Sequence, residues 1–269
     1  MYYTDLYLSN PTDSAVTVLH RLEFDIAGEL FAIIPRGTII TELFSAEGGK
    51  QMRKTLFDDG FQNHLVEGAS FVGEPGIPML MDLPDAPIPE TLVPCNKAAK
   101  QNGKHSAIDF YIHDKEFARV LTNTPHYLDL FKRFESVLTP DCTLMVGQSR
   151  CLQETNTYMN RAVGFFLQKN GIRIIPNIRW SDESSFEYCF LGVPKGKMVA
   201  VSTHGCIKTQ RQKELFRTGF SAMLDALEPP IVLVHGYTPE SIFGPFKDDV
   251  AIYRYPSQFE LTHPKGGEA

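Results

Sequence analysis

From residue 106 onward, short β-rich runs alternate with longer stretches whose apolar residues recur at helical spacing. The predicted strands cover residues 108–113, 142–146, 172–180, 198–202 and 231–235, and the predicted helices cover 127–137, 153–170 and 209–227. Strands that alternate with helices of this length indicate parallel β-α-β units with right-handed crossovers. We therefore expect an α/β fold with a parallel sheet, which is either open or curled into a partial or complete barrel.

The first 90 residues have a different pattern. Short apolar segments at 15–22, 30–35 and 38–44 are separated by Gly and Pro, as in strands joined by turns. Five prolines between residues 75 and 89 indicate an extended connector, because proline cannot donate to a ladder and disfavours helix before it. The expected organisation is a small β-rich module over 1–90, a linker over 91–105 and an α/β domain over 106–269.

Composition narrows the class of protein. The 269 residues are 43% hydrophobic and 22% charged, as in ordinary globular proteins. No apolar run reaches the roughly 20 residues of a membrane helix, and the start lacks the features of a signal peptide, so we expect a cytoplasmic protein without a membrane partner. The five cysteines show no C-x-x-C spacing, which disfavours structural zinc, and Cys142 and Cys189 lie in apolar runs typical of a core.

Charge is unevenly distributed along the chain. The formal net charge is −6, yet residues 150–217 hold eleven Lys or Arg against five Asp or Glu, which gives +6 there and −12 elsewhere. This block favours a local anionic ligand such as a nucleotide or a nucleic-acid segment. Solvated helix faces are the alternative explanation.

Candidate chemistry is expected at the carboxyl ends of the strands, where ligands bind in parallel sheets and barrels. The polar groups there include Asp114 after His113, Arg179 and Trp180, Ser202 with Thr203 and His204, and His235. His204 with Asp114 or Asp182 could act as a general acid or base, because imidazole titrates near neutrality. Arg161 and Arg179 could bind phosphates, and Trp180 could stack on a base.

Other chemistries remain open. His113, His204 and His235 could serve a metal-dependent hydrolase, but H-x-x-x-H and H-x-H spacings are absent, so no metal site is assigned and any cofactor is unknown. Cys206 could be a nucleophile if a nearby cation or helix N-terminus lowered its pKa. The dinucleotide and P-loop glycine motifs do not occur.

Residues 94–237 resemble an uncharacterised family of bacteria, phages and mobile elements, the domain of unknown function 4417. The matching stretches begin at Ile108-Asp-Phe-Tyr-Ile-His113, Leu138-Thr-Pro-Asp141, Asn160-Arg161, Gly171-Ile-Arg-Ile-Ile-Pro176, Ser185-Phe-Glu-Tyr188 and Val199-Ala-Val-Ser-Thr203. The resemblance implies a phage or mobile-element setting and supplies no reaction.

The resemblance also changes the ranking of site residues. Asp114, Asp141, Arg161, Trp180 and the pair Ser202-Thr203 match the family's motif, and Asp141 joins the catalytic candidates Asp114 and His204 on this ground. The family commonly has another residue at His204, and the sequence after Pro-Asp also differs. The first of these departures counts against His204 as an obligatory catalyst.

Two functions follow from these patterns. The first is an α/β protein that binds a nucleotide or nucleic-acid segment at its strand ends, with hydrolytic or transfer chemistry as an extension. The second is a non-catalytic phage or mobile-element protein that binds and inhibits a host protein, which the acidic remainder of the chain favours.

Overall fold

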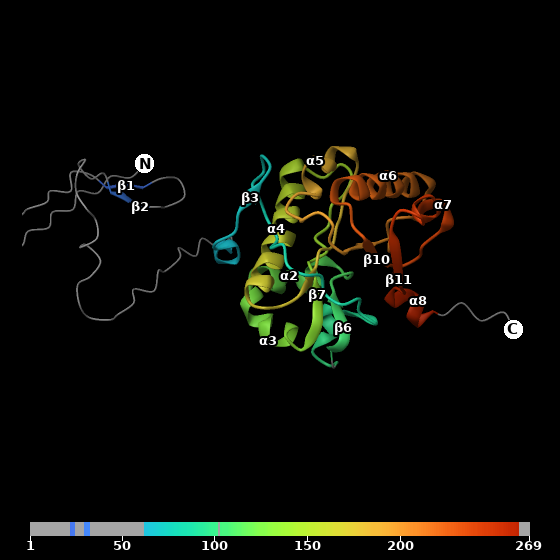
Figure 1. The fold of residues 1–269 in the computed structure, drawn as a ribbon, viewed down its shortest axis with the longest axis horizontal. Helices are drawn as coiled ribbons and strands as arrows, with labels where there is room; N and C mark the ends of the chain where they lie inside the picture. The colour runs from blue at the N-terminus through green and yellow to red at the C-terminus, as the bar shows by residue number, and fades with distance from the viewer. Residues whose placement is uncertain (1–21, 25–29, 33–61, 102, 264–269) are drawn as a thin grey trace, which may run out of the picture. The chain divides into compact units, whose positions relative to one another are not determined.

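A computed structural model of the chain describes residues 22–24, 30–32, 62–101 and 103–263 (Figure 1). The chain divides into two compact units, residues 1–54 and 55–269. In the first unit, β1 (Leu22–Phe24) pairs antiparallel with β2 (Leu30–Ala32), which falls inside the predicted run 30–35. The other strands predicted over 15–44 lie outside the described residues. The described part of 62–105 groups with the second unit, and the module boundary at residue 90 stays a prediction.

Two parallel sheets form the frame of the second unit. The four-stranded sheet has the order β5 (Thr91–Pro94), β6 (Gly103–Asp109), β7 (Phe134–Leu138) and β8 (Ile174–Ile175). The three-stranded sheet has the order β11 (Ala251–Tyr255), β10 (Ile231–His235) and β9 (Val199–Ser202). A short antiparallel pair, β3 (Phe71–Val72) and β4 (Ile77–Pro78), precedes them.

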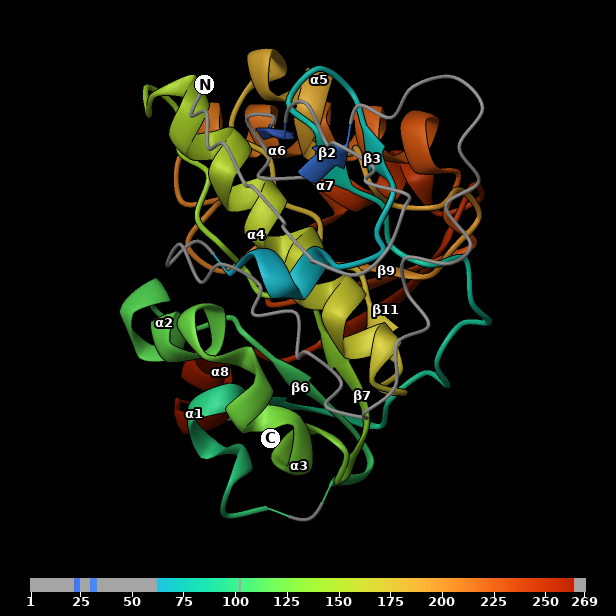
Figure 2. The same ribbon diagram turned by 90° about the vertical axis from the view of Figure 1, so that its left-hand side faces the viewer.

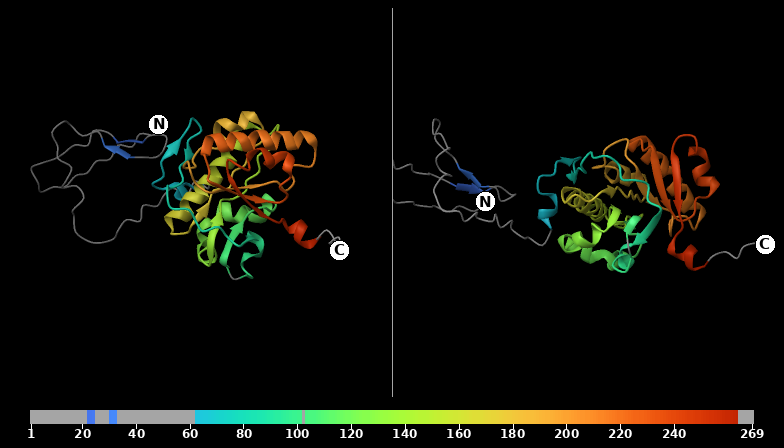
Figure 3. Two further views of the ribbon diagram at one scale, coloured as in Figure 1. Left: turned by 45° about the vertical axis from the view of Figure 1, so that its right-hand side comes forward. Right: turned by 60° about the horizontal axis from the view of Figure 1, so that its bottom comes forward.

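The segment after β8 joins the two sheets. Asn177 bridges Ala200 in parallel, the Ile178 amide donates to the Ala200 carbonyl at 2.8 Å, and the Ala200 amide donates to the Pro176 carbonyl at 2.8 Å. The strands therefore follow one another across the fold in chain order, all parallel, and Figure 3 shows the green strands beside the orange and red ones. This arrangement confirms the expected α/β class with a parallel sheet.

The joined sheets are curled. Side chains from their first to their last strand pack together in one apolar layer on the concave side. The members of this inner layer, all buried together in one cluster, are Ala107, Leu138, Ile175, Ala200, Leu233 and Tyr255, with Leu92 packed against it. The Tyr255 hydroxyl also donates to the Pro89 carbonyl at 2.6 Å, just before β5. Among the described residues no ladder joins β5 to β11, so the result is a partial barrel and not a closed one.

Helices cover the outer face over a second, larger core (Figures 1 and 2). They are α1 (Cys95–Ala98), α2 (Asp114–Thr122), α3 (Leu128–Phe131), α4 (Arg150–Lys169), α5 (Phe186–Cys189), α6 (Gln210–Leu227), α7 (Glu240–Phe243) and α8 (Gln258–Thr262). The long helices α4 and α6 confirm two predicted helices, and Thr209 with Gln212 forms a capping box that starts α6. Cys142 and Cys189 are buried in this core, as expected.

Three local predictions were wrong. The helix expected over 127–137 is limited to α3, and Phe134–Leu138 is strand β7. The apolar residues Phe131, Phe134 and Leu138 fit helical spacing, but Phe134 and Leu138 also fit strand alternation, and the β-sheet position decides between them. Residues 142–146 form no strand, and β6 covers 103–109, earlier than the predicted run 108–113.

Within the described part of the chain, no helix is both long enough and apolar enough to cross a membrane.

Candidate functional site

A polar layer lies above the inner apolar layer, at the carboxyl ends of the strands. Side chains alternate between the faces of a strand, so residues two positions beyond Ala107, Ile175, Ala200 and Leu233 face the same concave side. These residues are Asp109, Asn177, Ser202 and His235, and all four are buried. The curl of the sheets thus gathers polar groups from β6, β8, β9 and β10 at one mouth.

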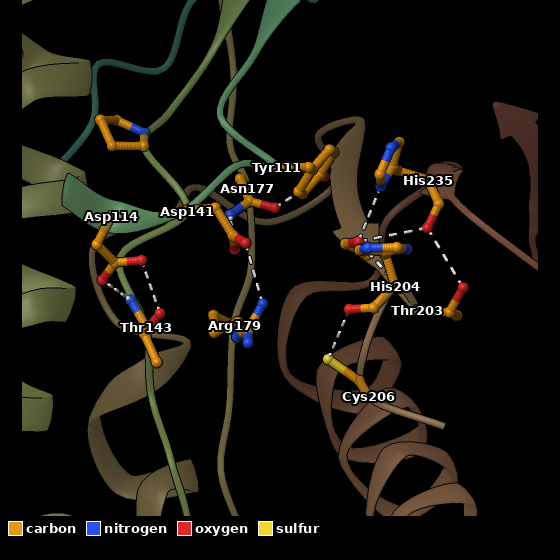
Figure 4. Close-up of polar contacts among 12 residues, drawn as sticks. Tyr111, Asp114, Asp141, Thr143, Asn177, Arg179, Thr203, His204, Cys206 and His235 are labelled. Atoms are coloured by element: carbon orange, nitrogen blue, oxygen red, sulfur yellow. Dashed lines mark hydrogen bonds and ion pairs between the residues drawn. The ribbon is translucent and has the colours of Figure 1, made fainter. Parts of the chain in front are cut away.

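Asp141, which follows β7, is the centre of the first hydrogen-bonded group (Figure 4). Its Oδ2 lies 3.0 Å from Arg179 Nη1, and its Oδ1 accepts from Asn177 Nδ2 at 2.8 Å. Burial raises the pKa of the Asp141 carboxyl, while Arg179 and Asn177 oppose the rise. Asp141 in turn raises the pKa of Arg179, so this cation is held in place and partly neutralised.

Tyr111 connects this group to the second sheet. Its hydroxyl donates to Asn177 Oδ1 at 2.9 Å, and its ring stacks on His235 with a centroid separation of 4.4 Å and an interplanar angle of 14°. Tyr111 lies two residues beyond Asp109 on the same concave side. It therefore bridges the polar ends of β8 and β10.

Asp109 is a buried carboxyl without an ion-pair partner among the described residues. It is 2% exposed, and its Oδ1 accepts from the Tyr111 amide at 2.9 Å. Burial raises the pKa of Asp109 from 3.8 to about 7, and nearby Asp141 adds to the rise. The group can therefore gain or lose a proton close to neutral pH.

Ser202 and His235 form the second group, with Ser202 Oγ 3.0 Å from His235 Nδ1. Ser202 Oγ also accepts from the His204 amide at 3.2 Å. Burial lowers the pKa of His235 to about 3, and His204 contributes to this. A neutral imidazole with Nδ1 engaged can offer Nε2 to a ligand, but it is too weak a base to activate Ser202 strongly near pH 7.

The loops after β9 and β10 are fastened to each other. The Thr203 amide donates to the His235 carbonyl at 3.0 Å, and Thr203 Oγ1 donates to the Tyr237 carbonyl at 2.8 Å. Gly236 has φ +103°, and a Cβ added there would lie 2.6 Å from Thr203 Oγ1. Glycine is required at this position for both its backbone conformation and the close contact.

Asp114 and the histidines around it have separate environments. Asp114 begins α2, and its carboxylate accepts from the Thr143 hydroxyl at 2.8 Å and the Thr143 amide at 3.1 Å, which holds the loop after β7. His113 is the residue before α2. His204 is exposed, and its ring lies 6.0 Å from that of His235. Within the described residues no three His, Cys, Asp or Glu side chains are placed to hold a metal ion.

Arg161 and Trp180 point into the core. Arg161 is 1% exposed, and its guanidinium donates to the Leu191 and Cys189 carbonyls at 2.9 and 2.8 Å and to the Asn160 side chain. The Trp180 ring is 9% exposed and packs against Phe216 at 5.1 Å. Arg161 therefore has its donors engaged by the protein. Most of Trp180 is covered by the core, and the small part that is exposed lines a cavity at the strand ends.

Two cavities open at the strand ends. The first, of about 530 Å³, is lined by residues after β7, β8 and β9 and by α6, including Arg179, Ser202, Cys206 and Arg211. The second, of about 580 Å³, is lined by the loops after β9 and β10 and by α8, including Thr203, His204, Lys208, Lys213 and Arg254. Both volumes are in the usual range for small-ligand sites.

Comparison with known proteins identifies the family. A family model described as a domain of unknown function, DUF4417, matches residues 69–256. The chain belongs to this family. The DUF4417 match extends from β3 to β11, so it covers the whole partial barrel and includes every residue of the two polar groups.

Two phage proteins are similar to this DUF4417 chain. The Gene 1 protein of Mycobacterium phage L5 is 33% identical over 139 residues, which are 52% of this chain and 59% of the relative. The Gene 1 protein of Mycobacterium phage D29 is 31% identical over 156 residues, which are 55% of this chain and 58% of the relative. The match thus spans less than two thirds of either relative. No solved structure matches the chain.

Several of the candidate residues predicted at the strand ends lie together in the structure. Arg179 contacts Asp141, and Ser202, Thr203, His204 and His235 lie around one pair of loops. Sequence reasoning missed three participants, which are Asp109, Tyr111 and Asn177. Alternate residues of a strand point to the same face, so these residues could have been found by counting in steps of two from the apolar residues that face the barrel interior.

Proposed function

We propose that the protein binds a nucleotide or a nucleic-acid segment at the carboxyl ends of its parallel strands. The observation that carries the proposal is the charge of the two cavities. Arg179 and Arg211 line the first, and Lys208, Lys213 and Arg254 line the second, whereas no Asp or Glu of the described chain lines either. Cavities walled by one sign of charge attract ligands of the opposite sign.

Several of these cations are available to a ligand. Arg179 is paired with Asp141, and Arg254 is paired with Glu260. In contrast, the side chains of Lys208, Lys213 and Arg211 contact no carboxylate within the described residues. Phosphate groups are the anions that nucleotides present, and Lys and Arg are their usual partners.

Exposed rings border the second cavity. Tyr237 is 45% exposed and Phe259 is 57% exposed, and both line it. Aromatic faces beside a basic groove support binding of single-stranded nucleic acid, because every base can stack on them. Tyr237 and Phe259, which are much more exposed than Trp180, are therefore the expected stacking surface.

Fluorescence anisotropy of a labelled single-stranded oligonucleotide, titrated with the full chain over a salt series, tests the proposal. We expect affinity to fall as salt rises. Replacing Lys208 and Lys213 by Ala should lower the slope of log K against log salt by about 1.4, since each lost phosphate contact on a single strand removes about 0.7.

A charge-matched control separates the cavity from general attraction. Lys100 and Lys132 are exposed and line neither cavity, so the double alanine variant loses the same charge elsewhere. Its slope should stay near that of the unmodified protein. Equal slopes for the two double variants would overturn the proposal, as would absence of binding at every salt concentration for both the oligonucleotide and free nucleoside monophosphates. Either result favours the alternative of a host-protein ligand.

A further inference from the structure

Gly205 lies where the two strand-end cavities meet, because it lines both of them. It has φ +78°, and a Cβ added there would find no atom within 4 Å. The residue is exposed. The space over Gly205 is therefore open, and both cavities border it.

The two cavities differ in chemistry. The first has Leu144, Met145, Leu215 and Phe216 in its walls, and one of its two arginines, Arg179, is paired with Asp141. The second holds the lysines Lys208 and Lys213 and the exposed imidazole of His204. A ligand with a flat apolar part and an anionic part matches this division.

We propose that one nucleotide unit lies across Gly205, with its phosphate against Lys208 and Lys213 and its base against the apolar residues of the first cavity. This inference rests on the proposed function and names the ligand unit and its orientation. The lysine ammonium groups supply charge-assisted hydrogen bonds to the phosphate. The apolar walls remove the faces of the base from water.

The backbone beside this site is held in place before any ligand binds. The hydrogen bonds of Thr203 to the His235 and Tyr237 carbonyls tie the loop that carries Gly205 to the loop after β10. Cys206 also donates its amide to the Thr203 carbonyl at 3.0 Å, which closes the turn around Gly205. A fixed loop loses little conformational entropy on binding, which favours affinity.

Isothermal titration calorimetry with the four deoxynucleoside 5′-monophosphates, their nucleosides and inorganic phosphate tests the phosphate position. The monophosphates should bind at least about tenfold more tightly than the nucleosides, a difference of 1.4 kcal/mol. Replacing Lys208 and Lys213 by Ala should abolish this preference and leave nucleoside affinity unchanged. The Lys100 and Lys132 double variant should keep the preference.

A substitution at Gly205 tests whether one ligand spans both cavities. Asn tolerates positive φ, so Gly205→Asn places a side chain over the junction with little backbone strain. Gly196→Asn is the matched control, because Gly196 has φ +69°, open space around its Cβ position and no place in either cavity. We expect Gly205→Asn to weaken monophosphate binding at least tenfold while inorganic phosphate binds as before, and Gly196→Asn to change neither.

The possible outcomes separate the two proposals. If neither oligonucleotides nor monophosphates bind the unmodified protein, the proposed function fails. If they bind, but the preference for phosphate survives loss of Lys208 and Lys213, or Gly205→Asn behaves like Gly196→Asn, only the orientation across Gly205 is refuted.

Discussion

Asp109 gives a quantitative test of the polar layer. The carboxyl is 2% exposed and keeps a single hydrogen bond, from the Tyr111 amide. Asp109→Asn preserves the shape of the side chain and an oxygen that can accept from this amide. The substitution removes the ability to ionise and replaces one oxygen by an amide NH2 group, whose effect does not depend on pH. The pH dependence of the change in stability therefore measures the cost of burying the charge.

The sign and size of this effect follow from the raised pKa. The folded protein keeps the Asp109 proton up to about pH 7, whereas the unfolded chain releases it near 3.8. Between these values the folded state binds more protons, so stability falls as pH rises and the loss is complete above pH 7. A shift of about three units at 1.36 kcal/mol per unit corresponds to about 4 kcal/mol.

Urea unfolding at pH 5, 6, 7 and 8 measures the free energy of unfolding of both proteins, and the fluorescence of the single tryptophan, the buried Trp180, reports the transition. The difference in unfolding free energy between Asp109→Asn and the unmodified protein should increase by about 2 kcal/mol from pH 5 to pH 7, in favour of the variant. Exposed Asp129, replaced by Asn, serves as the control. A difference that does not change with pH would refute the account of Asp109 as a carboxyl whose charge is penalised by burial.

Two further substitutions test residues that the sequence placed in the ligand site. Arg161→Lys should destabilise the protein by about 2–4 kcal/mol, because one ammonium cannot replace the guanidinium donors to the Leu191 and Cys189 carbonyls. The oligonucleotide affinity of the folded variant should be unchanged, and a loss of affinity without a loss of stability would contradict this reasoning. Gly219→Ala should destabilise the protein by about 1–3 kcal/mol and shift the tryptophan emission, because the new Cβ would lie 2.1 Å from Trp180 Nε1. The control Thr218→Ala, on the exposed side of α6, should change neither stability nor emission. Unchanged emission from Gly219→Ala would show that the Trp180 ring is not packed there.

Local pattern was informative where a segment has one dominant period. The helical spacing of α4 and α6 and the apolar runs of β9 and β10 identified these elements, and the alternation of elements predicted a parallel sheet. Ser202 and His235 were predicted as candidate site residues, since ligands bind at the carboxyl ends of parallel strands. Short segments such as 127–138 fit two periods, and for them the sheet position was decisive.

The sequence by itself determined the class of fold, the presence of polar residues at the carboxyl ends of the strands and the positively charged block over residues 150–217. Only the tertiary structure decided which side chains face the mouth. Curling of the sheets brings Tyr111 of one sheet onto His235 of the other, and the packing of α4 on the outer face turns Arg161 into the core. The physical reason is that curvature and helix rotation arise from contacts between residues distant in the chain, which a period counted over a few neighbours does not contain.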